Sequence, residues 1–417
     1  MKIGFFTDTY RPQINGVVEN VDLSARELRA RGHKVYIFAP KMSGYKDKDP
    51  HVIRLNSVRI LKNPEERLAM PLPTKGFRDM LRIDLDIVHA HGGGTMSLLG
   101  YQLAVVKGLP FLLTYHTLYT EYLHYFLKGK VITSDMVKRA SRVFCNLCDS
   151  VIAPSHKIEK ELLKYGVSKP ILVVPGGIDV SRFQNQPKGY LREKLNLKEN
   201  DKILLFTGRL GQEKNLGLLL KAFKIIAKVP GCYLVLVGDG PERKRLETMV
   251  QNANLESRVF FTGFIAENDI PKVYADSDLF LFTSKTETQG LVVAEALASG
   301  LPVVAVEDEA IGEMVKEGVN GYLTKNKPED FSDKVIFLLK NPTMRKTMGE
   351  KAKLEIKKNF TIHKQAETLE KIYKEVRLFQ KKNPRSVVKL TNRISSVYNF
   401  LNTATLVTVW KSLVRKL

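Results

Sequence analysis

The sequence predicts an α/β protein made of two doubly wound domains, each a parallel sheet covered by helices. Short apolar runs alternate with stretches of helical periodicity along most of the 417 residues, the order of elements in such a fold. The runs are continuously apolar, as expected for strands buried on both faces of a parallel sheet. The pattern begins again near Lys202, after a polar stretch at 181–200, so we expect a second domain there.

The strands are expected at the apolar runs. In the first domain these lie at 2–7, 34–39, 52–56, 86–89, 110–115, 150–153 and 172–174. In the second domain they lie at 202–207, 233–237, 259–261, 278–283, 302–306 and 321–323. Ligands of such sheets bind beyond the carboxyl ends of the strands, so two domains facing each other would form a cleft between them.

The length supports this division, because 417 residues exceed what one ordinary core accommodates. We expect an N-terminal domain at 1–180 and a C-terminal domain at 190–357. A helix at 358–380 would return towards the first domain. The last segment, 381–417, differs in composition and is expected to be a separate amphipathic tail.

The composition indicates a globular protein, with 44% hydrophobic and 26% charged residues. The longest apolar runs are strand-sized, far short of the roughly 20 residues of a spanning helix. The N-terminus does not resemble a signal peptide, because its apolar stretch is short and Asp8 follows it. We therefore expect a cytosolic protein. In that compartment the C-x-x-C of Cys145 and Cys148 is predicted to be a pair of buried structural thiols.

The net charge of +22 suggests an anionic partner: a membrane, a nucleic acid or a phosphorylated substrate. Residues 381–417 contain eight Lys or Arg and no Asp or Glu. Apolar residues recur there at helical spacing, and Trp410 lies among them. A cationic amphipathic helix with an aromatic anchor suits an anionic bilayer surface, although the same pattern fits a helix packed on the protein itself or on a second subunit.

The strongest local motif is KTETQGLVVAEALASGLP at 285–302. Glu287 and Glu295 lie eight positions apart, one before a predicted helix and one on its second turn. Gly290 permits a ligand to approach the backbone, and the first amides of the helix favour phosphate. The carboxylates would accept hydrogen bonds from ribose or sugar hydroxyls. Taken alone, two acidic residues near a helix start are equally consistent with simple capping.

Other motifs occur in a specific order along the chain. They are DTYRPQINGVV at 8–18, HAHG at 89–92, TYHT at 114–117, TGRLGQEKN at 207–215, GDGPE at 238–242 and TGF at 262–264. Together with the motif at 285–302 they resemble the retaining glycosyltransferases of family 4, which have the E-x7-E motif and the GT-B architecture of two Rossmann-like domains. The resemblance covers most of residues 1–375.

The resemblance implies a role for each matching residue. Arg209 and Lys214 would bind the donor diphosphate and stabilise the charge that develops on the leaving group. Glu295 would bind the ribose and Glu287 the hydroxyls of the transferred sugar. His116, which follows a predicted strand, would lie beside that sugar. Backbone contacts to the donor would come from Gly16, Gly263, Phe264, Gly290, Leu291 and Val292.

Neither a metal nor a resident cofactor is predicted. Asp276 and Asp278 resemble the D-x-D of metal-dependent glycosyltransferases, but they directly precede a predicted core strand. A carboxylate nucleophile with a covalent intermediate is one route to retention, and no carboxylate is clearly placed for it. We therefore favour attack on the same face of the sugar, with the leaving phosphate accepting the proton of the acceptor hydroxyl.

The acceptor is predicted from resemblance within the family. Residues 114–126 and 284–295 are most similar to bacterial diacylglycerol glucosyltransferases and related enzymes acting on phosphatidylinositol. This predicts transfer of a hexose, glucose foremost, from a UDP-sugar to a membrane lipid by a peripheral protein on the cytoplasmic side of the membrane. The basic and apolar segments 59–82 and 127–145 would help it dock. The alternatives are polyprenyl-linked, cell-wall or capsule acceptors, and a nucleic-acid-binding protein without recognised modules.

Overall fold

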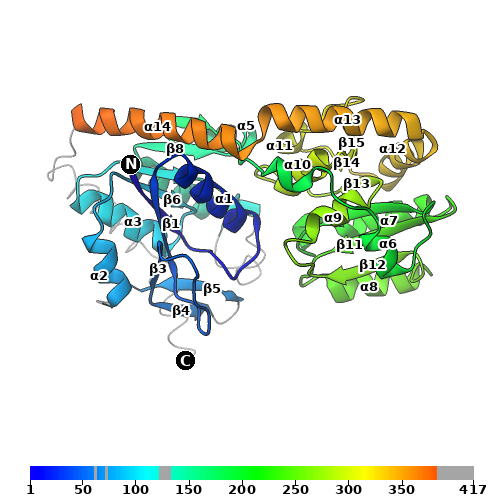
Figure 1. The fold of residues 1–417 in the computed structure, drawn as a ribbon, viewed down its shortest axis with the longest axis horizontal. Coiled ribbons are helices and arrows are strands. Elements are labelled where there is room, and N and C mark those ends of the chain that lie inside the picture. The colour runs from blue at the N-terminus through cyan, green and yellow to red at the C-terminus, as the bar shows by residue number, and fades with distance from the viewer. Residues whose placement is uncertain (61–62, 71–73, 122–132, 383–417) are drawn as a thin grey trace. The chain divides into compact units, whose positions relative to one another are not determined.

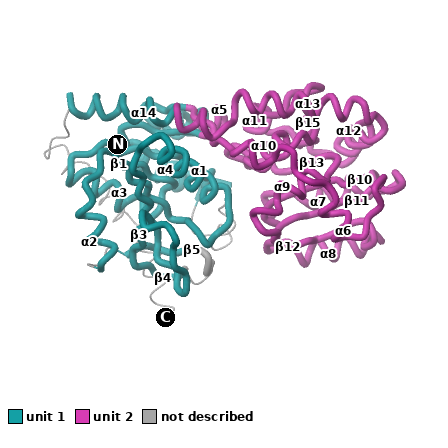
Figure 2. The backbone as a smooth tube through the Cα atoms, in the orientation of Figure 1, with its two compact units in different colours: residues 1–153, 159–172, 368–417 teal, residues 154–158, 173–367 magenta. Residues whose placement is uncertain are grey.

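The computed structural model describes residues 1–60, 63–70, 74–121 and 133–382 (Figure 1). This part of the chain divides into two compact units (Figure 2). Unit 1 contains residues 1–153 and 159–172 together with the described residues from 368 on, and unit 2 contains residues 154–158 and 173–367. The long helix α14 (Ile362–Lys382) begins in unit 2 and continues into unit 1.

Unit 1 is built on a parallel sheet with the strand order β3-β2-β1-β6-β7-β8-β9. The adjacent strands from β3–β2 through β7–β8 run parallel. The strands are β1 (Lys2–Thr7), β2 (Lys34–Pro40), β3 (Val52–Leu55), β6 (Ile87–His91), β7 (Phe111–Thr114), β8 (Ser150–Ala153) and β9 (Ile171–Val173).

The sheet of unit 1 has a core of aromatic and branched side chains. Phe6 on β1 stacks on Phe38 on β2, with ring centroids 4.4 Å apart, and both are fully buried. Burying each such side chain contributes about 1.5–3 kcal/mol. The helices are α1 (Gly16–Ala30), α2 (Lys75–Arg82), α3 (Thr95–Val106), α4 (Ser134–Leu147) and α5 (His156–Lys164), with the second part of α14.

A two-stranded antiparallel hairpin, β4 (Ser57–Ile60) and β5 (Asn63–Ala69), follows β3. The basic and apolar composition of 59–82 predicts only a docking segment there, and these strands were not predicted. Val58 and Leu68 are opposite each other across the hairpin and are both partly exposed. The segment 59–82 therefore begins in this hairpin and ends in α2, which starts at Lys75.

Unit 2 repeats the plan with the strand order β12-β11-β10-β13-β14-β15, and all pairs are parallel. The strands are β10 (Lys202–Thr207), β11 (Cys232–Val237), β12 (Val259–Gly263), β13 (Leu279–Phe282), β14 (Val303–Val306) and β15 (Gly321–Thr324). Their central residues form one continuous buried core, as the continuous apolar runs predicted.

The helices of unit 2 are mostly amphipathic, with their buried residues directed to this core. They are α6 (Tyr190–Leu195), α7 (Leu216–Ile226), α8 (Arg243–Asn252), α9 (Ile270–Ala275), α10 (Leu291–Ser299), α11 (Glu309–Gly312), α12 (Pro328–Lys340) and α13 (Pro342–Asn359). Two short 3₁₀ helices, η3 (Val180–Phe183) and η4 (Gln212–Lys214), complete the unit.

The prediction of two doubly wound parallel sheets is therefore confirmed, and every strand predicted for them is present. The amphipathic tail predicted at 381–417 lies outside the described residues from 383 on, and so does 127–132 of the second basic segment.

Candidate active site

Both sheets reverse their strand order at one point, between β1 and β6 in unit 1 and between β10 and β13 in unit 2. Ligands of doubly wound folds bind beside such switch points, beyond the carboxyl ends of the strands. The predicted site residues are distributed over both units. Gly16 and His116 belong to unit 1, and Arg209, Lys214, Gly263, Phe264, Glu287, Gly290, Leu291, Val292 and Glu295 belong to unit 2.

In unit 2 the structure brings two predicted site residues into direct contact. Lys214, at the end of η4, follows β10, and Glu287 lies in the loop after β13. The Nζ atom of Lys214 donates to Oε1 of Glu287 at 2.6 Å, and both side chains are largely buried. The hydroxyl of Thr283 binds the backbone oxygen of Lys214 at 2.8 Å and joins the two loops. The ion pair therefore bridges the switch point of unit 2.

The environment of Glu287 keeps its carboxylate charged. Burial alone would raise the pKa of Glu287, but the charge of Lys214, the hydrogen bond from Lys214 and one from Ser284 outweigh it. The pKa of Glu287 therefore lies below its ordinary value. A buried charged pair at a ligand-binding edge is an arrangement typical of functional sites.

Helix α10 begins directly after this loop. Its N-cap, Gly290, has a φ of 88° and provides no side-chain cap. The positive φ favours glycine at this position, and a Cβ atom there would lie 2.6 Å from Cδ1 of Ile311, so that side chain would have to shift. The first amides of a helix have no partner within the helix. Those of Leu291 and Val292 are of the kind that favours an anion, and the N-cap of their helix lies three residues after Glu287.

Glu295 lies on the second turn of α10, and its carboxylate accepts a hydrogen bond from a buried tyrosine. The hydroxyl of Tyr274, on α9, donates to Oε2 of Glu295 at 2.8 Å. The same hydroxyl lies 2.7 Å from Oγ1 of Thr207, at the end of β10. Tyr274 is fully buried, and burial, followed by the charge of Glu295, raises the pKa of Tyr274. The tyrosine therefore stays protonated and fixes one carboxylate oxygen of Glu295.

The remaining predicted residues of unit 2 follow the neighbouring strands. Arg209 is exposed two residues after β10. Gly263 is the last residue of β12 and accepts a hydrogen bond from the amide of Gly238 at 2.9 Å. Phe264 follows it with 70% of its side chain exposed. These positions lie along the same carboxyl edge of the sheet as Lys214 and Glu287.

In unit 1 two histidines lie at the carboxyl edge of the sheet, one on the switch-point strand β6 and one beyond its neighbour β7. His116 lies two residues beyond β7, and His91 is the last residue of β6. Nδ1 of His91 lies 3.0 Å from Nε2 of His116, and the two rings are stacked with centroids 5.3 Å apart. The sequence left open that His91 belonged to a flexible glycine turn; the structure places it in the sheet, 2% exposed.

A third histidine completes this cluster. Nδ1 of His89 lies 2.7 Å from the hydroxyl of Tyr373 on α14, and Nε2 lies 2.7 Å from Oγ1 of Thr114. Burial lowers the pKa of His116 to about 4. Burial, followed by the charge of His116, lowers the pKa of His89 to about 3. Burial, followed by the charges of His89 and His116, holds the pKa of His91 well below its ordinary value, so all three rings are neutral at pH 7.

The loop after β1 contains Gly16, the first residue of α1. Asn15 is the N-cap of this helix, and its side chain accepts hydrogen bonds from the amides of Val17 and Val18 at 3.1 and 3.0 Å. Gly16 itself is exposed beside this capped turn. The backbone at Gly16 is therefore accessible within unit 1, and its contact with the donor stays a prediction.

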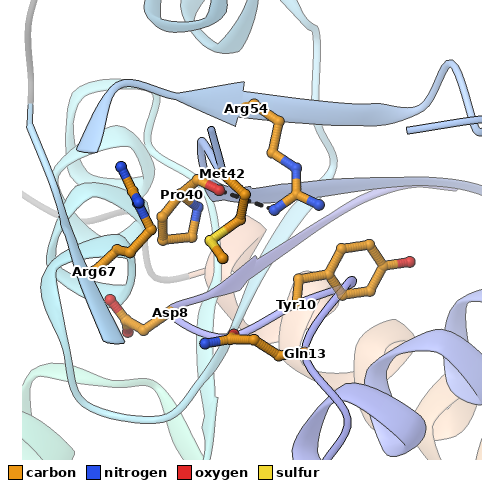
Figure 3. A pocket seen from close by; sticks show the side chains of 7 residues that line it. All are labelled: Asp8, Tyr10, Gln13, Pro40, Met42, Arg54 and Arg67. Atoms are coloured by element: carbon orange, nitrogen blue, oxygen red, sulfur yellow. Dashed lines mark hydrogen bonds between the residues drawn. The ribbon is translucent and has the colours of Figure 1, made fainter. Parts of the chain in front are cut away.

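A pocket of unit 1 lies beside the same loop (Figure 3). The carboxylate of Asp8 accepts hydrogen bonds from the amides of Gly94 and Met96 at the start of α3. Burial, only partly offset by these bonds, raises the pKa of Asp8. The pocket combines this acid with two arginines and uncharged side chains. Its lining residues are Asp8, Tyr10, Gln13, Pro40, Met42, Arg54 and Arg67.

Similarity to known proteins identifies the family of this chain. Residues 14–182 match the family described as Glycosyltransferase Family 4, and residues 188–355 match Glycosyl transferases group 1. The α-monoglucosyldiacylglycerol synthase of Streptococcus pneumoniae is 34% identical over 330 residues, which cover 78% of this chain and 75% of that protein. The chain belongs to glycosyltransferase family 4.

Further similarities agree with the family and the fold. The α-monoglucosyldiacylglycerol synthase of Acholeplasma laidlawii is 29% identical to the glycosyltransferase over 370 residues, covering 86% of this chain and 93% of that protein. HepE from Anabaena, solved in complex with UDP-glucose, superposes with a TM-score of 0.72 at 21% identity, covering 90% of this chain and all of that one. The glycosyltransferase thus has the predicted GT-B fold and is a hexosyltransferase.

The two aspartates that resemble a D-x-D motif have structural partners in the glycosyltransferase. The carboxylate of Asp276 forms an ion pair with Arg192 and accepts hydrogen bonds from the backbone amides of Gly189 and Leu191. Asp278 pairs with Arg345 at 3.2 Å. Among the described residues, no group of His, Cys, Asp and Glu is arranged to hold a metal ion. Metal independence stays a prediction.

Two other sequence predictions concern the rest of the glycosyltransferase. Cys145, Cys148 and Cys232 are buried and are not joined in disulfides. Burial raises the pKa of Cys145 to about 12, so the prediction of buried thiols at the C-x-x-C is confirmed. Within the described ranges, no helix combines the length and the apolar character needed to cross a bilayer.

Sequence reasoning missed two residues that support the predicted ones. Tyr274 lies in the segment before β13, where the sequence shows only an apolar helix face. His91 was recognised in its motif but given no role. The strand order provides a signal for His91, because β6 and β7 are neighbours and pair His91 with Thr114.

Proposed function

We propose that this enzyme transfers glucose from UDP-glucose to diacylglycerol at an anionic membrane surface, with retention of the anomeric configuration. The observation that carries the proposal is the similarity, over most of the chain, to two α-monoglucosyldiacylglycerol synthases. The bridged switch point of unit 2, with Lys214, Glu287 and the uncapped start of α10, supplies the chemistry that a nucleotide-sugar donor requires.

The donor diphosphate would be bound by cations and backbone amides. The ammonium of Lys214 has three N–H donors and can bridge Glu287 and a phosphate oxygen. The first amides of α10, at Leu291 and Val292, would bind the same group, and Arg209 would add a second cation from the loop after β10. These charges are fixed before the reaction and stabilise the UDP that leaves.

The two glutamates would bind the hydroxyls of the sugar and of the ribose. Glu295, held by Tyr274, would accept hydrogen bonds from the ribose hydroxyls. Glu287, kept charged by Lys214, would accept them from the glucose. In unit 1, Gly16 would let the backbone approach the donor, and His116 would contact the glucose as a neutral ring. Gly263 and Phe264 would shape the nucleotide pocket.

The reaction exchanges one bond at the anomeric carbon for another. The bond between this carbon and the β-phosphate oxygen breaks, and a bond to the acceptor hydroxyl oxygen forms on the same face of the sugar. The hydroxyl proton passes to the leaving phosphate oxygen, so no protein base is consumed. Lys214 and the α10 amides would stabilise the short-lived ion pair in this step.

The membrane side of the proposal is supported by helix α2. Its exposed residues Lys75, Arg78 and Arg82 recur at helical spacing, together with Leu81, which is 44% exposed. Each basic residue near an anionic leaflet contributes about 1 kcal/mol of binding. The eight cations of the tail after Gln380 would add to this attraction. We propose that the enzyme is peripheral and acts from the cytoplasmic side.

The test is a glycolipid synthesis assay with purified full-length protein, UDP-glucose and liposomes of diacylglycerol with or without an anionic phospholipid. We expect glucosyldiacylglycerol, formed faster on anionic liposomes and lost in the Lys214→Ala variant. UDP release without glycolipid would reject diacylglycerol and direct the search to phosphatidylinositol, polyprenyl-linked or cell-wall acceptors. Turnover of another sugar nucleotide alone would reject UDP-glucose.

A further inference from the structure

We infer that His91 is a positioning residue, which holds His116 in one tautomer and one orientation. This inference rests on the proposed function, because His91 would act on the sugar only through His116. His91 belongs to the HAHG motif at 89–92, to which the proposed reaction assigns no role.

The ring of His91 is fixed from several sides. It is the last residue of β6 and is 2% exposed. Phe5 packs against it in an edge-to-face contact, with centroids 4.7 Å apart, and His89 lies 4.3 Å away on another side. The neighbouring strands β6 and β7 pair His91 with Thr114, and Nε2 of His116, two residues further on, lies 3.0 Å from Nδ1 of this ring. His116 is only half-buried, so His91 is the more rigid partner of the pair.

The hydrogen bond between the two rings determines where each proton lies. Both histidines are neutral, so the 3.0 Å contact between Nδ1 of His91 and Nε2 of His116 contains one proton. Nε2 of His91 is buried and has no hydrogen-bond partner in the described part of the structure. An unpartnered buried N–H is rarer in proteins than an unpartnered acceptor. We therefore assign the proton to Nδ1 of His91.

This assignment fixes the chemistry of His116. Its Nε2 accepts from His91, so its own proton lies on Nδ1. The ring can then offer an N–H, and not a lone pair, on its Nδ1 side. Such a donor suits a sugar hydroxyl oxygen. In the other tautomer Nδ1 would be an acceptor, and the buried Nε2 of His91 would carry an orphaned proton.

The first experiment measures the tautomer itself. Long-range ¹H–¹⁵N spectra of the full-length protein with labelled histidine identify the protonated nitrogen of each ring, and the His116→Gln variant assigns the signals. We expect His116 to be protonated on Nδ1 in the wild type. Protonation of His116 on Nε2 would overturn the inference. This readout requires no substrate, so it stands even if the proposed function fails.

The second experiment uses a matched pair of variants. In His91→Asn the side-chain amide overlays the Nδ1 edge of the imidazole and retains an N–H, whereas His91→Phe retains the ring shape without a donor. We expect His91→Phe to lower kcat/KM for the UDP-sugar about 10- to 100-fold, and His91→Asn to restore it to within about threefold. Equal losses in both variants, with unfolding midpoints like that of the wild type, would reduce His91 to a packing role.

Discussion

The carboxyl edges of the two sheets, each with one switch point, carry groups of different charge. In unit 2 the loops after β10 and β13 are joined by a buried ion pair, Lys214 with Glu287. In unit 1 the ends of β6 and β7 carry neutral histidines, His91 and His116, whose pKa values are lowered mainly by burial. Doubly wound folds bind ligands beyond the strand ends, and the residues there differ between the units in the charge of the ligand that they favour.

The difference has a structural basis in how far each side chain lies from its sheet. His91 belongs to β6 and is packed on all sides, an environment that excludes charge. Lys214 and Glu287 lie in loops, where each can meet the opposite charge. A diphosphate suits the second environment, and an uncharged sugar or acceptor suits the first.

The largest expected effect comes from removing the charge of unit 2. Lys214→Ala should lower kcat about 10²- to 10³-fold, because one fixed donor to the leaving group is lost. The acid limb of the pH–rate profile should also move to higher pH, since Lys214 is what keeps the pKa of Glu287 low. Lys221→Ala, at an exposed position of α7, is the control. A similar kcat in both variants would separate Lys214 from the reaction.

The neutral state of the buried histidines in unit 1 can be tested through the pH dependence of the free energy of unfolding. In the unfolded chain histidines bind protons near pH 6.5, but in the fold His116 and His89 do so only near pH 4 and 3. The unfolded state therefore binds more protons between these values, and stability falls as the pH drops below 6.5. We expect a loss of roughly 2 kcal/mol per buried histidine between pH 6.5 and 5.

Urea unfolding of the wild type and of His89→Gln at several pH values measures this slope. His89→Gln should be less stable at pH 7 but lose less stability on acidification. His363→Gln, at an exposed position of α14, should retain the wild-type slope. Parallel curves for all three proteins would mean that His89 binds its proton as readily in the fold as in the unfolded chain.

A smaller effect is expected from removing the buried hydroxyl of Tyr274, which donates a hydrogen bond to Glu295. Tyr274→Phe should weaken UDP binding about tenfold, because Glu295 loses the donor that orients it. Titration calorimetry with UDP and with 2′,3′-dideoxy-UDP separates the two causes of weaker binding. The variant should lose affinity for UDP and little for the analogue. Tyr233→Phe, on β11, is the control, and equal losses for both ligands would point to a general defect of the pocket.

The smallest difference concerns the glycine that begins α10. Gly290→Ala should destabilise the protein by about 1–3 kcal/mol, from its positive φ and from the contact with Ile311. Gly32 has a similar φ of 86° but open space around it, so Gly32→Ala should cost only about 1 kcal/mol. Urea unfolding at pH 7 compares them, and a Gly32→Ala loss as large as that of Gly290→Ala would assign the whole effect to the backbone.

The sequence predicted the sheets well because their strands are buried on both faces. Continuous apolar runs such as 203–206 have no other plausible place in a folded chain, and the structure confirms them. The hairpin β4–β5 was missed because it lies outside both sheets and contains Asn63-Pro64, a pair that indicates a turn. A half-exposed hairpin has no continuous apolar run to mark it.

The site was predicted only as separate residues. Motifs named Lys214 and Glu287, but their contact depends on the path of two loops, 73 residues apart in sequence. The pair of His91 and His116 follows from strand order, which the sequence left unspecified. Tyr274 supports Glu295 from a helix whose apolar neighbours resemble ordinary core, so its hydroxyl gave no signal.

The burial of all three cysteines makes the protein suitable for site-specific fluorescent labelling. Thiol reagents attack the thiolate, and burial raises the pKa of Cys145 and Cys232 to about 12. A maleimide dye would therefore react with an introduced surface cysteine and spare the native ones. One such cysteine in each unit would allow energy transfer to report, in single molecules and without removing any natural residue, whether UDP-glucose changes the distance between them.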